Sequence, residues 1–272
     1  MKIPGTKTLV MGRAGAGKTY STRTLFNIKG LQPFHAFIEP SMVLVGNIPE
    51  AKYNYTNPMG AGVNKHTLMD IGRKINTLGN EDLQKGSILK PDFTQWMEFI
   101  DSLNNFTDQD GKAWGDVEGW NTDRVLVIDG LTGLTRMSRG LAVGAKPLLT
   151  QPDFGVIMEN IYVLLQYLTL SLTCHVVLIS HLEMERDEIN GGLLKTCATI
   201  GRKLAPTIPP MFDDVVIAEK IADQFTWTTI ETGSDTKNRN LPLANDLKQD
   251  FAFLLECWQK NGGVIEKTEV KK

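Results

Sequence analysis

The chain has 272 residues, 42% of them hydrophobic and 22% charged, which suits one large α/β domain or one domain with insertions. Its formal net charge of −2 gives no overall basic signature, so any binding of nucleic acid has to come from local patches. The three cysteines form no C-x-x-C pair and fit reduced thiols in a cytosolic protein.

The first recognisable feature lies close to the N-terminus. Residues 8–11 form a short apolar run that suits a buried strand, and residues 12–19 read G-x-x-x-x-G-K-[ST], the phosphate-binding P-loop. Residues 20–27 contain no Gly or Pro and are expected to continue as a helix, which completes the strand, turn and helix that this motif requires. The early position of the motif leaves no room for a signal peptide.

The chemistry of the P-loop predicts a site for ATP and Mg²⁺. Its glycines let backbone N–H groups close around phosphate oxygens, and a helix N-terminus adds partial positive charge. Lys18 can reach the β- and γ-phosphates, and Thr19 can offer its hydroxyl to Mg²⁺. A chance Gly-rich turn is the alternative. The predicted nucleotide-binding residues are Gly12, Arg13, Ala14, Gly15, Ala16, Gly17, Lys18, Thr19 and Tyr20.

A second strand is expected at residues 35–39, where an apolar segment ends on Glu39 before a proline. Residues 41–123 look like an insertion, with mixed signals and a short helix at residues 67–77. An amphipathic helix opens at Pro91 and Asp92. Its apolar face is expected to pack in the core and consists of Phe93, Trp96, Met97, Ile100 and Leu103.

Residues 124–129 supply the second nucleotide-binding pattern. Four apolar residues close on Asp129, as in a Walker B strand, and a P-loop upstream makes this pattern informative. Asp129 is expected to hold the Mg²⁺ shell beside Thr19. A helix follows at residues 131–143. The apolar stretch at residues 154–172 contains Glu, Asn and Gln and is interpreted as a buried helix, not a membrane span.

The last third of the chain adds further strands to the same sheet. Residues 175–180 form a buried strand, and His181 sits just beyond its end, at the edge where open α/β sheets bind ligands. Residues 215–218 and 225–231 are expected to be late strands, which can be joined as a hairpin. A terminal amphipathic helix spans residues 246–260, and a charged tail follows at residues 266–272.

Hydrolysis of ATP needs a group that orients or deprotonates the attacking water. Many ATPases place Glu directly after the Walker B aspartate, but here that residue is Gly130. Glu39 is therefore the candidate base, and a surface carboxylate is the alternative. His181 begins an H-L-E string with no P-C-x-x-C downstream, which excludes a zinc deaminase. A metal site with Glu183 and Glu185 lacks convincing partners.

Taken together, Glu39, Asp129 and a polar group after the next strand resemble the RecA-like ATPase core. Lys237-Asn238-Arg239 looks like the K-x-R element of RecA-like ring helicases and recombinases, which in those families reaches the γ-phosphate of a neighbouring subunit. The layout of residues 8–242 is most similar to phage nucleotide-binding proteins, among them the RecA-like single-strand annealing proteins of the Sak group.

The resemblance implies a mostly parallel central sheet flanked by helices, with late strands that can be antiparallel, in a single domain over residues 1–272. It implies that His181 senses the γ-phosphate, with a structural histidine as the alternative, and that Lys237 and Arg239 act in trans within a ring or filament. It also implies a cytoplasmic phage protein in a bacterial host cell, with single-stranded DNA and a single-strand binding protein as partners. No membrane partner is expected.

In RecA-like proteins the loops after the Walker B and sensor strands line the DNA path, which corresponds here to residues 136–152 and 182–205. Basic side chains on such loops bind phosphates without sequence preference, although ordinary solvated charge is the alternative. The candidates are Arg136, Arg139, Lys146, Lys195, Arg202 and Lys203. Trp114 and Trp120 are expected to anchor the acidic loop that carries them, with base stacking as the alternative.

Three functions remain open from the sequence. The leading one is a DNA-stimulated ATPase that handles single-stranded DNA in phage recombination or replication. The second is a P-loop kinase of a small molecule, although such kinases usually carry an Arg-rich lid and no dense Arg cluster occurs here. The third is a nucleotide-gated adaptor, such as a helicase loader, that binds ATP and barely hydrolyses it.

Overall fold

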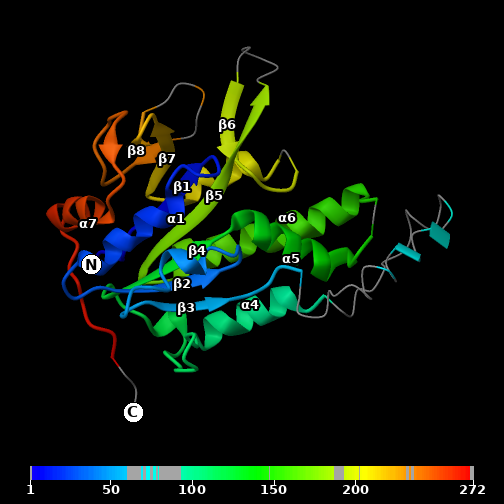
Figure 1. Cartoon of the computed structure of the whole chain (residues 1–272), viewed down its shortest axis with the longest axis horizontal. Coiled ribbons are helices and arrows are strands. Elements are labelled where there is room, and N and C mark those ends of the chain that lie inside the picture. Colours follow the sequence, from blue (N-terminus) through cyan, green and yellow to red (C-terminus); the bar gives the residue numbers. More distant parts are fainter. Residues whose placement is uncertain are drawn as a thin grey trace.

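A computed structural model of the chain is shown in Figure 1. It describes residues 2–59, 69, 72–73, 76–77, 79, 93–146, 148–186, 193–201, 203–230, 233 and 236–269. Across the sheet the strands are β10 (Leu247–Lys248), β8 (Gln224–Thr228), β7 (Asp214–Ile221), β1 (Lys7–Gly12), β5 (His175–Arg186), β4 (Arg124–Asp129), β2 (Gln32–Phe37) and β3 (Lys52–Tyr55). Outside this order, β6 (Leu193–Cys197) pairs with β5, and β9 (Lys237–Asn238) pairs with β7.

The protein therefore has an α/β fold with a mixed, mostly parallel sheet, as predicted. The six strands from β7 to β3 run parallel to their neighbours. The late strands β8 and β10 are antiparallel, and β7 and β8 form the predicted hairpin. Its turn includes Ala222, which has a φ of 53°.

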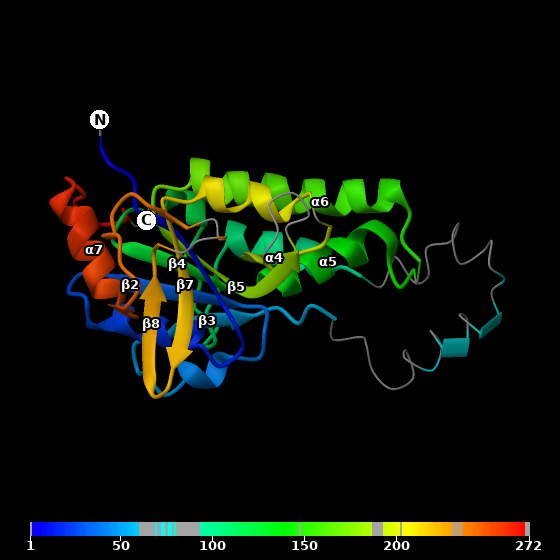
Figure 2. The same ribbon diagram turned by 90° about the horizontal axis from the view of Figure 1, so that it is seen from above.

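Helices cover both faces of the sheet. Leu9 and Met11 pack in one core with α4 (Gln95–Asn104), α5 (Leu131–Val143) and α6 (Gln151–Gln166), and these three helices lie side by side in Figures 1 and 2. On the other face Val10 packs with α7 (Phe251–Lys260) and the helical segment after the P-loop. This burial of both faces explains why the central strands are continuous apolar runs in the sequence.

The order of the strands brings distant parts of the chain to one edge of the sheet. Strand β5 lies between β1 and β4, and β2 lies on the far side of β4. In register, Gly12 pairs with His181, and Asp129 pairs with both Ile179 and Phe37. The carboxyl ends of β1, β2 and β4 therefore meet at the level of residue 181 in β5.

The helix expected after the P-loop is α-helical for only one turn. α1 (Lys18–Ser21) passes directly into η1, a 3₁₀ helix (Thr22–Asn27). Three hydroxyl groups donate to the carbonyl three residues earlier: Ser21 to Lys18, Thr22 to Thr19 and Thr24 to Ser21, at 2.6–2.8 Å. Such side-chain bonds compete with the α-helical pattern, and their three-residue spacing matches the tighter 3₁₀ turn.

The strand predicted at residues 175–180 is longer in the structure. β5 continues to Arg186 and forms a hairpin with β6 that projects beyond the sheet edge (Figure 1). His181 is therefore part of the strand, although it still lies at the level of Gly12. Residues 182–185 alternate between apolar and charged side chains, which is the pattern of a half-exposed strand.

The described parts of residues 41–123 join the central core. β3 adds an edge strand beside β2 that the sequence reasoning missed, because an edge strand buried on one side needs no apolar run. Trp120 is buried, and both Trp114 and Trp120 contact the ring of Phe34. These tryptophans therefore anchor the loop. The expected helix at residues 67–77 falls mostly outside the described residues.

The amphipathic helix α4 begins at Gln95, while Pro91 and Asp92 lie outside the described residues. Trp96 and Leu103 are buried as predicted, but Met97 is 49% exposed and Phe99 is fully buried in its place. Positions 96, 99 and 103 are spaced three and four residues apart, so they share one face of the helix.

The interpretation of residues 154–172 as a buried helix holds for one face only. α6 and the π-helical turn η5 (Tyr167–Ser171) bury one face through residues such as Ile157 and Ile161, but Val163 is 52% exposed and Leu170 is 77% exposed. By length and composition alone, Gln151–Ser171 could span a membrane. Its buried face packs against α5 in the core.

The predicted terminal helix is confirmed as α7, which is capped by Asp250.

Candidate functional site

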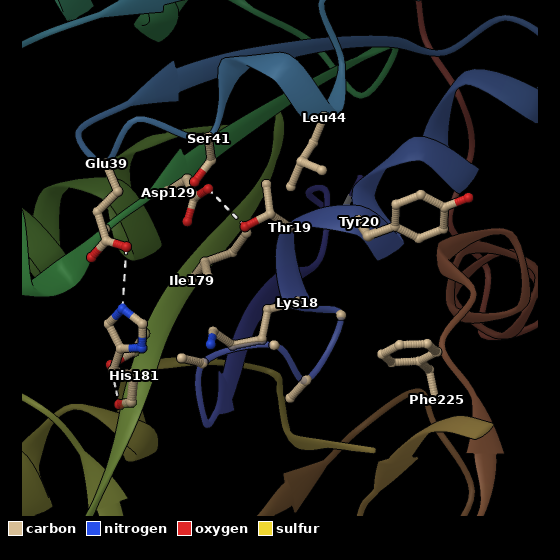
Figure 3. A pocket seen from close by; sticks show the side chains of 16 residues that line it. Lys18, Thr19, Tyr20, Glu39, Ser41, Leu44, Asp129, Ile179, His181 and Phe225 are labelled. Carbon is tan, nitrogen blue, oxygen red and sulfur yellow. Dashed lines mark hydrogen bonds and ion pairs between the residues drawn. The ribbon is translucent and has the colours of Figure 1, made fainter. Parts of the chain in front are cut away.

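The P-loop lines a cavity of about 410 Å³ at the carboxyl edge of the sheet (Figure 3). Residues from five separate parts of the chain line this cavity: the P-loop and Tyr20, Glu39 with Ser41, Asp129, His181, and Phe225. Gly15 and Gly17 have φ angles of 76° and 83°. L-residues rarely adopt these values, so the course of the loop depends on glycine at both positions.

Lys18 lies folded over the loop in this structure. Its Nζ donates hydrogen bonds to the carbonyl oxygens of Gly12 and Arg13, both at 2.8 Å. Burial lowers the pKa of Lys18, while the charges of Asp129 and Glu39 oppose that shift. The ammonium group is therefore a positive charge held at the mouth of the loop, with two weak carbonyl partners that an anion can replace.

Thr19 and Asp129 form the predicted pair of oxygen ligands. The Thr19 hydroxyl donates to Oδ2 of Asp129 at 2.8 Å, and Ser41 hydrogen-bonds to the same carboxyl group. Burial raises the pKa of Asp129 to about 6, and repulsion from Glu39 adds to this shift.

The residues at this point fit Mg²⁺ only in combination with a nucleotide. Mg²⁺ prefers oxygen ligands and usually binds through one or two carboxylates together with substrate phosphates. Thr19 and Asp129 supply adjacent oxygens of this kind. Among the described residues, no group of three His, Cys, Asp or Glu side chains could hold a metal by itself.

Glu39 and His181 meet at one end of the cavity (Figure 3). Oε2 of Glu39 lies 3.1 Å from Nε2 of His181, and both side chains are about one-third exposed. The backbone N–H of Glu39 points to the carbonyl of Asp129 at 3.3 Å, which holds this carboxylate beside the Thr19–Asp129 pair. Glu39 is thus a partly solvated carboxylate that a histidine orients, as a group that activates water must be.

Gly130 explains why the carboxylate comes from the neighbouring strand. Its φ is 127°, and a Cβ atom at this position would lie 3.0 Å from Cγ of Glu39. A side chain directly after Asp129 would therefore need Glu39 to shift by a few tenths of an ångström, and the positive φ itself favours glycine. Ser41 is a site residue that the sequence reasoning missed. Its one available signal was its position two residues after Glu39.

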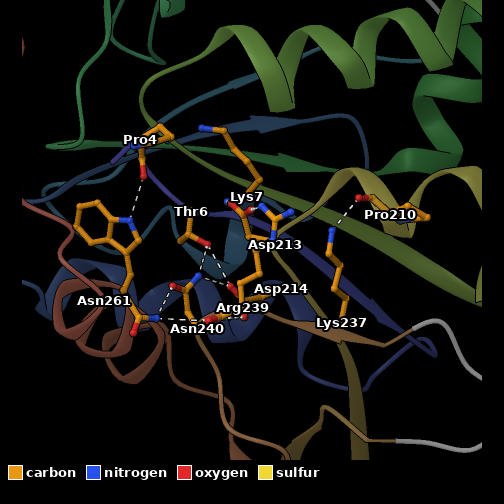
Figure 4. A network of polar contacts seen from close by, with 11 residues as sticks. Pro4, Thr6, Lys7, Pro210, Asp213, Asp214, Lys237, Arg239, Asn240 and Asn261 are labelled. Atoms are coloured by element: carbon orange, nitrogen blue, oxygen red, sulfur yellow. Dashed lines mark hydrogen bonds and ion pairs between the residues drawn. The ribbon is translucent and has the colours of Figure 1, made fainter. Parts of the chain in front are cut away.

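Lys237 and Arg239 lie at the other edge of the sheet (Figure 4). β9 pairs with the start of β7, where Asp214 is opposite Asn238. Lys237 donates to the carbonyl of Pro210 at 2.8 Å, and Arg239 pairs with Asp213 at 2.7 Å. Neither residue belongs to the P-loop cavity of its own chain. Their action on a neighbouring subunit stays a prediction.

The candidate DNA contacts differ in their availability. Arg136 and Lys203 are exposed. Lys146 is buried and forms a 2.6 Å ion pair with Asp153, which completes the capping box of α6 with the N-cap residue Thr150. The charge of Lys146 therefore stabilises the start of this helix. The remaining candidates are Arg139, which donates to the carbonyl of Lys146, Lys195, which lies 3.5 Å from Glu219, and Arg202, which falls outside the described residues.

Two buried histidines next to this core predict how stability depends on pH. His35 is enclosed by the rings of Phe26 and Phe37, and His175 accepts a hydrogen bond from the Thr6 N–H. Burial lowers the pKa of each to about 3. Unfolded histidine binds a proton near pH 6.5, so the unfolded state binds more protons between these values. Stability is therefore lost as the pH falls below about 6.5.

We expect each buried histidine to cost about 2 kcal/mol of unfolding free energy between pH 7 and pH 5. Asp129 works in the opposite direction, because its raised pKa makes the folded state bind the extra proton. Urea unfolding of the nucleotide-free and magnesium-free protein at both pH values measures the sum. Between pH 7 and pH 5, Asp129→Asn should lose more unfolding free energy than the wild type, because it lacks the carboxyl group whose protonation opposes the effect of the histidines. If Asp129→Asn is equally stable at both pH values, the lowered pKa values assigned to His35 and His175 are wrong.

Comparisons with known proteins identify no family for the chain. No family model matches it, and no curated protein matches it. Among solved structures, a similar chain comes from a structural study of the Pyrococcus horikoshii OT3 protein PH0250. That chain is 6% identical with a TM-score of 0.34, over 90% of this chain and 92% of the other. A likeness at this level carries no argument about function.

Proposed function

We propose that this protein is a magnesium-dependent ATPase of the RecA-like class that acts on single-stranded DNA during phage recombination or replication. The observation that supports it most is the meeting of three groups in one cavity: the P-loop with Lys18, the Thr19–Asp129 pair, and Glu39 held by His181. Together they provide a phosphate cradle, metal ligands and a base, which are the parts that hydrolysis of a nucleoside triphosphate requires.

Each side chain has a distinct role in this proposal. Lys18 leaves its two carbonyl partners and neutralises the β- and γ-phosphates. Mg²⁺, held by Thr19 and Asp129 through their oxygens, supplies charge neutralisation at the phosphates when it is bound. Glu39 accepts the proton of the attacking water. His181 holds the Glu39 carboxylate through the 3.1 Å contact and lies close enough to the reacting end to respond to the γ-phosphate.

Three observations favour a DNA-stimulated ATPase over the two alternatives. Glu39 lines the cavity with Lys18 and Asp129 and contacts His181, which suits a base that activates water. A kinase must exclude that water, and an adaptor does not need such a base. The β5–β6 hairpin continues from His181 beyond the sheet edge. A ligand bound to the hairpin can therefore shift the position of His181, because β5 runs through both. Arg136 and Lys203 offer exposed positive charge of the kind that binds phosphates without sequence preference.

Phosphate release from ATP, measured with and without single-stranded DNA, tests the proposed function. We expect release that depends on Mg²⁺ and rises several-fold with single-stranded DNA, and that disappears in the control Asp129→Asn. A kinase would release little phosphate in either condition and would need a small-molecule acceptor. An adaptor would bind ATP but turn over barely, with or without DNA. Either result would contradict the proposal.

Assembly gives a further prediction, because a RecA-like site is completed by the neighbouring subunit. We expect ATP to promote a ring or filament, and Arg239→Ala to bind ATP but hydrolyse it poorly, since a guanidinium meets phosphate oxygens in a fixed bidentate geometry. Mixing Arg239→Ala with Lys18→Ala should restore activity, because some interfaces then pair an intact P-loop with an intact arginine. Phosphate release by the mixture measures this.

Asp213→Asn is the matched control for this experiment. Arg239→Ala also breaks the 2.7 Å ion pair with Asp213, so a loss of activity could come from local instability. Asp213→Asn breaks the same ion pair and leaves Arg239 in place, so it should remain active. Equal loss of activity in both variants, or a monomer at every ATP concentration, would show that Arg239 serves its own chain alone.

A further inference from the structure

Two large aromatic side chains lie at the end of the P-loop cavity that is opposite Glu39 and His181 (Figure 3). Tyr20 follows the P-loop directly and is 59% exposed, and Phe225 on β8 is 42% exposed. Both rings line the phosphate cavity, and both also line a second cavity of about 670 Å³. The two cavities therefore join at the pair of rings.

Phe225 is held at a constant position relative to the P-loop. A Cβ atom on Gly17 would lie 2.8 Å from Cδ1 of Phe225, so the ring edge touches the loop backbone. The buried Gln249 ties the same strand to the loop, because its Nε2 donates to the carbonyls of Ala16 and Thr226, both at 2.9 Å. A ligand on the P-loop therefore meets this ring without a rearrangement of β8.

Each ring also carries a cation on one face. The Arg23 guanidinium lies 5.2 Å from the centre of the Tyr20 ring, and Nζ of Lys220 lies 5.3 Å from the centre of the Phe225 ring. Arg23 is itself anchored, since it donates to the carbonyl of Leu44 at 2.8 Å. These cations stabilise the rings through their π-faces, and stacking of another planar group would use the face of each ring that the cation does not cover.

We propose that Tyr20 and Phe225 hold the base of the bound nucleotide by stacking. This inference rests on the proposed nucleotide site. With the phosphates at Lys18 and Thr19 and the terminal phosphate toward Glu39, the nucleoside extends to the other end of the cavity, where the two rings lie. The second cavity beyond them has room for a ribose and a base. Base–aromatic stacking needs only a π-face.

The same geometry predicts which nucleotides bind. The polar side chains of the second cavity that lie nearest the loop are already engaged: Ser21 donates to Lys18, Thr24 to Ser21, and Gln249 to Ala16. Stacking by itself discriminates by the area of the base and not by hydrogen bonds to its edge. Purine nucleotides should bind more tightly than pyrimidine nucleotides, and ATP and GTP should bind about equally, within roughly threefold.

The test compares ATP with inorganic tripolyphosphate, which occupies the P-loop but has no base. We expect Tyr20→Ala and Phe225→Ala each to weaken ATP binding by about tenfold, within the range that stacking on aromatic side chains contributes. Tripolyphosphate affinity should stay at the wild-type value. Tyr20→Phe and Phe225→Tyr keep an aromatic ring and should bind ATP like the wild type. Titration calorimetry with Mg²⁺ present measures all of these affinities.

The outcomes separate this inference from the proposed function. If the wild type binds neither ATP nor tripolyphosphate, both are wrong. If the wild type binds ATP and Lys18→Met does not, while both alanine variants bind ATP normally, the nucleotide site stands and the stacking proposal is overturned. Equal loss of ATP and tripolyphosphate in the alanine variants would mean that the rings only support the loop. Loss of single-stranded DNA affinity with ATP affinity intact would assign the rings to DNA, which also overturns the proposal.

Discussion

Glu39→Gln is expected to bind ATP with the affinity of the wild type and to hydrolyse it at least about a hundredfold more slowly. Glutamine keeps the size of the side chain and its contact with His181, which is 3.1 Å in this structure. It cannot accept a proton from water at neutral pH, and general base catalysis typically contributes about 10²–10⁴-fold. Single-turnover measurement of phosphate release, with ATP binding measured in parallel, separates the two effects.

Glu183→Gln is the matched control for this substitution. Glu183 is exposed on the same strand as His181, so the change removes one negative charge close to the site without touching the cavity. It should hydrolyse ATP at the wild-type rate. His181→Asn should fall between the two variants, because it loosens Glu39 without removing the carboxylate. Normal hydrolysis by Glu39→Gln would place the base elsewhere and weaken the RecA-like assignment.

The second large effect concerns Lys18. We expect Lys18→Met to lower the affinity for ATP by about a hundredfold or more, since loss of a charged partner from a desolvated pair costs about 2–5 kcal/mol. Methionine keeps the aliphatic stem, which lies so close to Gly12 that a Cβ atom there would be 3.3 Å from Cδ of Lys18, so the loop retains its packing. Equilibrium binding of ATP measures the loss, and thermal unfolding checks that the fold survives.

Lys29→Met serves as the control for charge alone. Lys29 is exposed shortly after η1, so this variant changes net charge by the same amount far from the phosphates. Its ATP affinity should equal that of the wild type. If Lys18→Met also keeps wild-type affinity, residues 12–19 are not a nucleotide-binding P-loop, and the proposed function is wrong.

Contiguous patterns were predicted well. The strands β1 and β4 and the helix α5 were expected within one residue of their observed ends, because a buried central strand is an apolar run and a helix next to it begins and ends at glycine. The Thr19–Asp129 contact could also be predicted. Both residues follow parallel strands directly, and such strands end at the same edge of a sheet.

Elements that depend on distant partners were predicted poorly. β3 has no apolar run, because its pairing with β2 alone defines it. β5 runs past residue 180 because β6 pairs with its second half. Phe99 and Met97 exchange the roles expected of them, since the direction from which α5 approaches α4 decides which helical face is buried.

By itself, the sequence determined the α/β class, the P-loop, the acidic end of β4 and Glu39 as the candidate base, since each is carried by a few neighbouring residues. Tertiary structure alone decided that Glu39 meets His181, 142 residues away, that Phe225 lies against Gly17, and that Lys237 and Arg239 lie at the opposite edge of the sheet. The physical reason is that strand order and register are settled by packing summed over the whole core. No local pattern records which strand ends lie side by side.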